Sequence, residues 1–553
     1  MEDFIFGTLI TDELKLIYHR ARNSGLQHNY NISPLRPVAN EPVQVSVLVG
    51  NDLGAEYIAC YYTLDGSLPT GNHGAASNGA VILLQREKIN WDTMSWGYTE
   101  TWQGEIPAQP EGALVKYRIG AWKEGGPETV ADWPDVKYSQ ELATHAHFSG
   151  QPMPKINRDD PGRGKTFCYH VHAYQAPQWA RESVIYHVFV DRFYPGDGRE
   201  WNAEADLRGY CGGTLWGVRD KLDYIQDLGA TAIWLSPAWP STSYHGYDVT
   251  DFQSVSPLLG GDEAMRALIQ AAHARGIKIL LDLVCNHASN EHPYFMDAIK
   301  NPDSQYRELF IFDESDIGYR TFFGVRSMPQ VNLQNEAAKA WMIDIARFWL
   351  REFAVDGFRL DHANGPGPGF WSEFQKACKD ENPDCLLVGE VVEPSTDYLY
   401  YAGRLDGLLD FGLNDSIRRA HGFGSYSEAE FERFLQRHLQ FFRDSGLLMP
   451  TFIDNHDLDR FLFIAGGDKA RLRKAAEIQF ELPGPPIIYY GTEVGMSQQF
   501  SVREIEGLVV SREPMLWDQR QDRGLLEFYQ SLARQRQENR PWERDGLNIA
   551  QAA

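Results

Sequence analysis

The spacing of hydrophobic and polar positions changes near residue 150. Before that point, apolar residues alternate with polar ones over short stretches, as in EPVQVSVLVG at 41–50. Alternation with a period of two is typical of a strand with one buried face, and turn formers such as Asp65-Gly66 separate the stretches. This pattern predicts an N-terminal β-sandwich over residues 1–150. A segment rich in Pro, Gly and charge at 151–180 is predicted to be a linker.

After residue 180, apolar runs of strand length alternate with amphipathic helical stretches such as GDEAMRALIQAAHARG. Eight such runs with helical stretches between them predict an α/β fold, a (β/α)₈ barrel over 181–545, with a short inserted domain at about 288–332. A doubly wound sheet is the structural alternative, but it does not need eight evenly repeated units. The predicted strands lie at 184–190, 230–237, 277–284, 355–360, 385–390, 407–411, 448–454 and 485–490.

Polar residues follow four of these strands, where a barrel of this type places its site. Arg359 and Asp361 lie two apart at the end of the fourth strand, so they share one face. Burying such a pair is a poor route to stability, which favours a functional role. One Asp after a strand is usually a cap or a turn residue, but four clusters are hard to explain that way. The other clusters are Asp282, Asn286 and His287; Glu390; and His456 with Asp457.

Composition excludes several classes of partner. The 553 residues are 43% hydrophobic and carry a formal net charge of −24, which argues against nucleic acid and against an anionic membrane surface. No apolar run is long enough to span a membrane, and the acidic start does not match a secretory signal. The six cysteines are scattered without a C-x-x-C pair, so no zinc site is expected and a cytoplasmic location is predicted.

Four segments then carry a family resemblance: DLVCNH, GFRLDHAN, LLVGE and FIDNHD resemble the signature segments of the α-amylase family of glycoside hydrolases. HGYD at 245–248 and MPQVN at 328–332 fit the same pattern, and the resemblance covers roughly 180–540. The chain most resembles the neopullulanase, cyclomaltodextrinase and maltogenic amylase branch. However, GEVVE lacks the Trp that this branch usually has two residues after its acid/base, so the substrate stays open.

The resemblance implies a retaining hydrolase of α-1,4 and perhaps α-1,6 glucosidic bonds in α-glucans, with roles for particular residues. Asp361 would be the nucleophile, Glu390 the acid/base, and Asp457 the carboxylate that stabilises the charged transition state. Asp282 is expected to be a structural hydrogen-bond hub. The expected substrate-binding residues are Arg359, which would hold Asp361 ionised and oriented, and Tyr247, His245, His287 and His456.

No cofactor is expected to be required. The resemblance makes calcium a candidate at two separate sites. One is at Asn286, where Gly365 stands in place of the His of calcium-dependent relatives, and the second follows the first strand, where Asp197 and Asn202 supply oxygen atoms. The family's C-terminal β-sandwich is expected to be absent, so apolar surface on the last helix needs cover from the N-terminal domain or from a second subunit in a homodimer. The family often carries an N-terminal carbohydrate-binding module, so the resemblance implies that the domain at 1–150 is carbohydrate-binding-like. Five tryptophans in it could pack a core or stack on sugars: Trp91, Trp96, Trp102, Trp122 and Trp133.

Two other functions remain as alternatives. The chain could be a glucosyltransferase or sucrose-active relative, because no motif decides whether water or a sugar accepts the glucosyl group. It could also be a catalytically inactive carbohydrate-binding scaffold, since a fold does not fix a function. The intact set of Asp361, Glu390 and Asp457 argues against the inactive scaffold.

Overall fold

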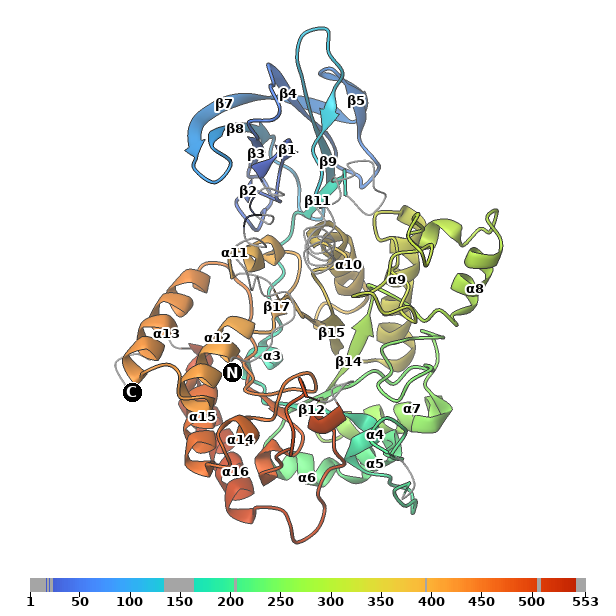
Figure 1. Ribbon diagram of the computed structural model, residues 1–553, viewed down its shortest axis with the longest axis vertical. Helices are drawn as coiled ribbons and strands as arrows, with labels where there is room; N and C mark the ends of the chain where they lie inside the picture. Colours follow the sequence, from blue (N-terminus) through green and yellow to red (C-terminus); the bar gives the residue numbers. More distant parts are fainter. Residues whose placement is uncertain are drawn as a thin grey trace.

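The computed structural model describes residues 16, 19, 23–133, 164–202, 206–392, 395–504 and 509–543. A domain of antiparallel strands sits on one side of a parallel barrel that helices surround (Figure 1). Within the described residues, no helix is both long and apolar enough to cross a membrane.

The N-terminal domain is a set of antiparallel strands in two layers that share one long strand. This strand, β7, pairs with β4 through its first half and with β8 through its second, and its register shifts between Arg86 and Lys88. A shift of this kind bends and twists a strand, which lets β7 pass from one layer to the other. The strands are β1 (Leu26–Gln27), β2 (Ile32–Ser33), β3 (Val43–Val49), β4 (Tyr57–Thr63), β5 (Thr70–Asn72), β6 (Ala75–Asn78), β7 (Ala80–Asp92), β8 (Gly97–Ile106), β9 (Leu114–Trp122) and β10 (Thr129–Val130).

Part of the predicted linker belongs to this domain. Residues 167–170 form β11 (Phe167–His170), which pairs antiparallel with β9. Phe167 and Tyr169 are buried in the core of the domain. The run FCYH is only four residues long, and the Pro- and Gly-rich residues before it dominate the composition of 151–180, so composition alone predicts a linker there. Residues 151–163 lie outside the described residues.

Seven strands of the barrel form one parallel ladder in the order β17-β16-β15-β14-β13-β12-β18. The predicted seventh strand, 448–454, closes the ring through two parallel bridges, from Leu448 to Gly407 of β17 and from Thr451 to Pro486 beside β18. The eight predicted strands therefore all lie in the barrel wall. The ladder strands are β12 (Ile185–Val188), β13 (Ala232–Leu235), β14 (Lys278–Val284), β15 (Gly357–Asp361), β16 (Leu386–Gly389), β17 (Gly407–Leu408) and β18 (Ile487–Tyr489).

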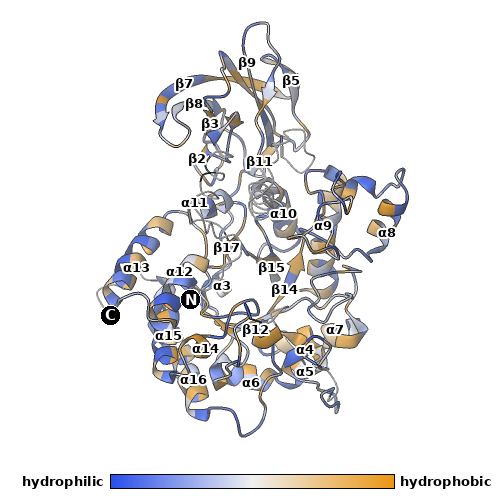
Figure 2. Ribbon diagram, viewed as in Figure 1, coloured by the Kyte–Doolittle hydropathy of each residue, from blue (hydrophilic) through white to orange (hydrophobic). Residues whose placement is uncertain are grey.

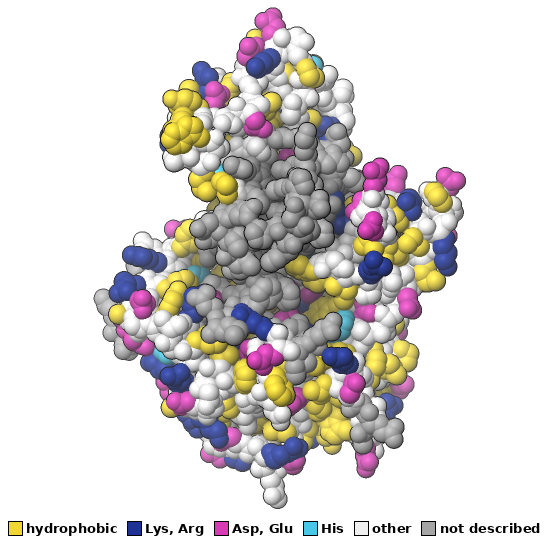
Figure 3. All heavy atoms as spheres, viewed as in Figure 1, with side chains coloured by type: hydrophobic (Ala, Val, Ile, Leu, Met, Phe, Trp, Pro, Cys, Tyr) yellow, Lys and Arg dark blue, Asp and Glu magenta, His cyan; other side chains and the backbone are white. Residues whose placement is uncertain are grey.

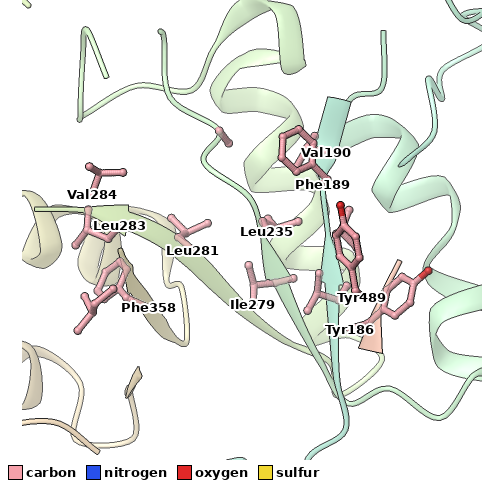
Figure 4. Packing of buried hydrophobic residues seen from close by; sticks show 14 of the residues in the cluster. Tyr186, Phe189, Val190, Leu235, Ile279, Leu281, Leu283, Val284, Phe358 and Tyr489 are labelled. Atoms are coloured by element: carbon pink, nitrogen blue, oxygen red, sulfur yellow. The ribbon is translucent and has the colours of Figure 1, made fainter. Parts of the chain in front are cut away.

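Alternation along the strands decides which side chains enter the barrel. On β14, Ile279, Leu281 and Leu283 pack outward in the large core between the strands and the helices, as Figure 4 shows. Leu280 belongs to the inner core, so Asp282, two residues further on, also faces inward.

Helices cover the barrel because each has one apolar face. In α7 the buried positions are Ala264, Met265, Leu268, Ile269 and Ala272. Figure 2 shows this mixture as blue and orange on single helices. The α-helices are α3 (Gln178–Glu182), α4 (Val190–Phe193), α5 (Leu215–Asp220), α6 (Leu222–Asp227), α7 (Gly261–His273), α8 (Pro293–Lys300), α9 (Glu336–Phe348), α10 (Pro368–Glu381), α11 (Ser395–Tyr398), α12 (Phe411–Ile417), α13 (Glu428–Phe442), α14 (Phe461–Ile464), α15 (Lys469–Glu481) and α16 (Arg523–Asn539).

The segment after β14 leaves the barrel and returns over the end of that strand. It contains α8 and a short 3-10 turn at Arg307–Leu309, and it returns through bridges such as His287 to Gln330. This return brings Phe322 against His287, with ring centroids 4.7 Å apart. The insert therefore forms one wall above the barrel.

The two domains meet through buried polar contacts. Lys116 on β9 is 2.9 Å from Glu336 on α9 and 3.1 Å from Glu373 on α10, and its side chain is only 4% exposed. Ser372 of α10 also donates to the carbonyl of Cys168 on β11 at 3.2 Å. These contacts fix the antiparallel domain against one side of the barrel.

Candidate active site

Three barrel strands converge on the guanidinium of Arg359. Its Nη1 lies 2.7 Å from Oδ1 of Asp282 on β14 and 2.8 Å from Oδ1 of Asp361 on its own strand. Its Nη2 lies 2.6 Å from Oε1 of Glu390, which directly follows β16. Arg359 is 2% exposed, so one buried cation holds three carboxylates together.

Asp282 anchors this cluster from behind, as expected of a hydrogen-bond hub. Its Oδ2 accepts from the indole Nε1 of Trp234 at 3.1 Å and from the hydroxyl of Tyr247 at 3.0 Å. The same hydroxyl lies 2.6 Å from Nε2 of His456. His187 stacks on Trp234 with ring centroids 3.6 Å apart. The inner barrel therefore orients Arg359 through Asp282.

Asp457 is held by a residue that sequence reasoning missed. The Nη2 of Arg512 lies 2.8 Å from Oδ1 of Asp457, and its Nε donates to the carbonyl of His456 at 2.8 Å. Nη1 of Arg512 donates to the hydroxyl of Tyr244 at 3.2 Å. Arg512 lies beyond the last strand and outside every motif used in the sequence analysis. Its role could not be predicted because only the fold brings it next to Asp457.

These groups face a cleft of about 560 Å³ at the carboxyl ends of the strands. Of the predicted residues, Asp361, Glu390, Asp457, His245, Tyr247 and His287 line it. Arg359 and His456 are not in that lining and contact its carboxylates from below. Cleft residues that the sequence analysis did not single out include Arg512, Phe322, Phe323 and His362.

His362 links the nucleophile candidate to Glu390 through the backbone. It directly follows Asp361, takes a left-handed conformation with φ of 43°, and its N–H donates to Oε2 of Glu390 at 3.1 Å. A non-glycine residue in this region is uncommon and is found more often at functional sites. The backbone turn therefore helps to orient Glu390.

Arg359 does lower the pKa of Asp361, as expected, but the net shift of that pKa is upward. Burial raises the pKa of Asp361 above its ordinary value, Arg359 opposes this rise, and the neighbouring carboxylates Glu390, Asp282 and Asp457 add to it. Burial likewise raises the pKa of Asp282 to about 6, against the effect of Arg359. One guanidinium does not offset the combined effect of burial and the neighbouring carboxylates.

Burial favours the neutral form of three histidines of the site. Burial lowers the pKa of His245 to about 3 and that of His287 to about 3, and it lowers the pKa of His456 well below its ordinary value. A neutral imidazole can donate one hydrogen bond and accept another, which suits the recognition of hydroxyl groups. Burial also keeps the Tyr247 hydroxyl protonated, because it raises the pKa of that group.

The residues present do not fit the first of the two predicted calcium sites. Asn286 is buried, and a Cβ at Gly365 would lie 2.0 Å from its Oδ1, so no side-chain ligand fits at position 365. At the second predicted site Asp197 and Asn202 are both exposed, and the N–H of Asp197 donates to Asp220 at 3.0 Å. Within the described residues, no group of three or more His, Cys, Asp or Glu could hold a metal ion.

The alpha-amylase catalytic domain model matches residues 187–540 of the chain, which contain all the residues of the cleft. The chain belongs to the alpha-amylase family. This alpha-amylase family member shares 41% identity over 364 residues with Alpha-amylase 2 of Dictyoglomus thermophilum, covering 65% of this chain and 64% of the relative. It shares 34% identity over 389 residues with Neopullulanase 2 of Thermoactinomyces vulgaris, covering 67% and 65% respectively. These matches span about 65% of the length of these relatives.

The structure of this chain resembles a solved cyclomaltodextrinase structure over both domains. The TM-score is 0.62 with 26% identity, and the match covers 93% of this chain and 84% of the other. A cyclic α-maltosyl-(1→6)-maltose hydrolase from Arthrobacter globiformis matches with a TM-score of 0.59 and 28% identity, over 65% of this chain and 84% of that one. The prediction of a barrel with an N-terminal β-domain is therefore confirmed, and so is the resemblance to this branch.

Proposed function

We propose that the chain is a retaining glycoside hydrolase that cleaves α-1,4-glucosidic bonds, with α-1,6 bonds as a second target, in maltooligosaccharides, cyclodextrins or starch-type glucans. The observation that carries this proposal is the contact of Arg359 with both Asp361 and Glu390. Carboxyl groups on the two nitrogens of one guanidinium lie within a few ångströms of each other. Retaining enzymes need their two carboxyl groups about 5 Å apart.

In this mechanism Asp361 attacks the anomeric carbon and forms a covalent glucosyl-enzyme intermediate. Arg359 engages Oδ1 of Asp361, which leaves Oδ2 as the attacking atom. The bond between the anomeric carbon and the leaving oxygen breaks as the new ester bond forms. Because burial raises the pKa of Asp361, the cation is needed to keep this carboxylate ionised near neutral pH.

Glu390 gives its proton to the leaving oxygen and then takes one from the incoming water. The N–H of His362 and the guanidinium of Arg359 fix the orientation of its carboxyl group. Asp457, held by Arg512, stabilises positive charge on the sugar ring and accepts from its hydroxyls. His245 and His287, which are neutral and line the cleft, donate to hydroxyl groups of the same sugar, and Tyr247 packs against its ring. His456 lies below the cleft, where its Nε2 is 2.6 Å from the Tyr247 hydroxyl and 3.2 Å from Oδ2 of Asp457, so it positions these two groups.

The substrate class comes from the relatives and not from the geometry. Their names include neopullulanase, cyclomaltodextrinase and maltogenic amylase, which is why we propose α-glucans as substrates. A relative at 32% identity over 390 residues is the intracellular maltogenic amylase of Bacillus subtilis. All six cysteines of this chain are buried, free thiols, which is compatible with a reducing cytoplasm.

The test is product analysis on maltoheptaose, β-cyclodextrin, pullulan and sucrose, with wild type beside Glu390→Gln. Turnover of the glucans with retained α-configuration, lost in the variant, is the expected result. Glucosyl transfer from sucrose would support the transferase alternative instead. No turnover of any substrate by the wild type would contradict the proposal and favour the inactive scaffold.

A further inference from the structure

A buried tryptophan of α10 contacts the backbone beside the nucleophile candidate. The indole Nε1–H of Trp371 donates to the carbonyl oxygen of Ala363 at 2.6 Å, two residues after Asp361. Trp371 is 0% exposed, unlike Trp96 and Tyr98 at the tip of β7 and β8, where Figure 3 shows hydrophobic side chains on the surface at the upper left. Trp371 therefore cannot touch a substrate, and any effect on the reaction must pass through Ala363.

The turn that contains Ala363 makes two contacts with the acid/base candidate. The N–H of His362 donates to Oε2 of Glu390 at 3.1 Å, and the N–H of Ala363 donates to the carbonyl oxygen of Glu390 at 2.8 Å. Glu390 comes directly after β16, and its own N–H donates to the carbonyl of Leu360 on β15 at 2.9 Å. The conformation of the turn therefore helps to set the position of Glu390.

This turn is strained and is held from outside. His362 has the left-handed φ of 43°, and such a conformation persists where surrounding contacts enforce it. The N–H of Gly365 donates to the carbonyl of His362 at 3.0 Å and closes the turn. A buried carbonyl keeps the orientation in which it finds a donor, and the Trp371 indole is the short donor to Ala363. The hydroxyl of Tyr401 is a second donor to the same oxygen, at a long 3.5 Å.

The ring of Trp371 is itself fixed by its surroundings. Its centroid lies 4.7 Å from that of Phe370 and 5.2 Å from that of Phe374. The next residue, Ser372, donates to the carbonyl of Cys168 on β11 at 3.2 Å, so α10 is held between the antiparallel domain and the barrel (Figure 1). A close-packed indole keeps one rotamer, and the carbonyl that it binds keeps one position.

We propose that Trp371 is a positioning residue for Glu390 and acts through the turn that follows Asp361. Its hydrogen bond fixes the Ala363 carbonyl, and the turn then keeps the N–H of His362 directed at the carboxyl group of Glu390. This inference rests on the proposed function, because it concerns how the acid/base of that reaction is oriented toward the leaving oxygen.

Asp361 depends less on this turn than Glu390 does. It is the last residue of β15, where it pairs with Val284 of β14, and Arg359 contacts its Oδ1 at 2.8 Å. Loss of the Trp371 hydrogen bond should therefore weaken proton transfer to the leaving group more than it weakens nucleophilic attack. A displacement of about 1 Å at a catalytic group can lower a rate by roughly 100-fold.

The test compares two leaving groups in the wild type and in Trp371→Phe, which keeps an aromatic ring in the core and removes the N–H. Maltotriose releases a sugar whose oxygen must be protonated, whereas α-maltosyl fluoride releases fluoride ion, which needs no acid. The kcat/KM of both substrates reports the steps up to formation of the glycosyl-enzyme. We expect kcat/KM to fall by roughly 10- to 100-fold for maltotriose and by less than about threefold for the fluoride.

Trp349→Phe is the matched control. Trp349 is also 0% exposed and donates its indole N–H to the carbonyl of Phe252 at 2.7 Å, and neither residue lines the cleft. This variant should lower the melting temperature as much as Trp371→Phe and leave kcat/KM unchanged for both substrates. If Trp371→Phe does not fold, Tyr401→Phe removes the weaker donor to the Ala363 carbonyl and should give a smaller loss that is again confined to maltotriose.

The outcomes separate this inference from the proposed function. An equal fall of kcat/KM for both substrates in Trp371→Phe would overturn the inference, because it would assign the residue to the fold as a whole or to Asp361. Unchanged kcat/KM for both substrates would overturn it as well, and an active wild type beside such a variant would leave the proposed function standing. A wild type that turns over neither substrate would refute both.

Discussion

Arg512 holds Asp457 by its side chain and by the backbone beside it. Nη2 of Arg512 lies 2.8 Å from Oδ1 of Asp457, while Nε donates to the carbonyl of the preceding His456 at 2.8 Å. The two contacts join the segment that follows β18 to the residues that follow the seventh strand of the barrel, 448–454. Because Arg512 is 4% exposed, the carboxylate cannot turn away from the cleft without disturbing a buried guanidinium.

Replacing Arg512 should therefore reduce turnover through the geometry of Asp457. Arg512→Met should lower kcat on maltoheptaose by roughly 100-fold, because an oriented charge at the transition state is lost. Arg512→Lys should recover only part of this, since an ammonium cannot make the forked contact. Steady-state kinetics separate kcat from KM. Arg520→Met, an exposed control, should leave both unchanged; an equal rise in KM with normal kcat would assign Arg512 to substrate binding instead.

Asp361→Asn should lower kcat by at least about 10⁴-fold, because removing a covalent nucleophile abolishes the two-step route. Sodium azide should restore part of the turnover of an activated glucoside and give a β-glucosyl azide, since the small anion attacks in place of the carboxylate. Product configuration by NMR checks this. Asp380→Asn, an exposed carboxylate on α10, serves as the control. A loss of less than tenfold would remove Asp361 from the role.

The acid limb of the pH profile should respond to the charge on Asp282. The charge on Asp282 helps to raise the pKa of Asp361, so Asp282→Asn should lower that pKa. The nucleophile is active when ionised, and the acid limb of kcat/KM should therefore move to lower pH, by roughly one unit. Trp234→Phe removes a hydrogen-bond donor to Asp282 without changing its charge, and should not produce that shift. An acid limb of kcat/KM at the same pH in Asp282→Asn as in the wild type would contradict this coupling.

The barrel could be read from the sequence because its signals are local. Each strand is a short apolar run, and its side-chain alternation places Arg359 and Asp361 on the inner face. All eight predicted strands lie in the barrel wall, although the seventh appears only as bridges at Leu448 and Thr451. The carboxylates converge because parallel strands end at one rim, which follows from topology alone.

The remaining features depend on contacts between distant segments. Arg512 has no local signal, because its role arises from packing against a residue 55 positions earlier. The raised pKa of Asp361 could not be inferred from one neighbouring arginine, since it depends on burial and on several carboxylates together. Strand β11 was missed for a related reason, because its partner β9 lies about 50 residues before it.

Chelation of metal ions should leave the enzyme intact. Asn286 fills the space beside Gly365, and Asp197 and Asn202, the candidates for the second site, are both exposed, so neither site encloses an ion with several oxygen ligands. We expect less than about 20% change in kcat and no change in melting temperature after dialysis against EDTA. Activity assays and calorimetry on the same sample check this. A loss that calcium restores and magnesium does not would show a calcium site built from other residues.

His438 should stabilise the fold in a pH-dependent way. It is buried with its Nε2 2.8 Å from Oδ2 of Asp410, and this carboxylate raises the pKa of His438 despite the opposing effect of burial. A base whose pKa is raised on folding contributes stability below its unfolded pKa of about 6.5 and loses it as the pH rises through the folded pKa. His438→Gln should therefore lower the melting temperature by several degrees at pH 6 and by less at pH 9.

His421 gives the matched control because its titration has the opposite sign. Burial lowers the pKa of His421, so its charged form opposes folding at low pH. His421→Gln should therefore be less destabilising at pH 6 than at pH 9, the reverse of His438→Gln. Differential scanning calorimetry at both pH values measures the two variants. Equal losses for His438→Gln at both pH values would mean that the residue contributes through packing against Phe434 and Phe442 and not through its charge.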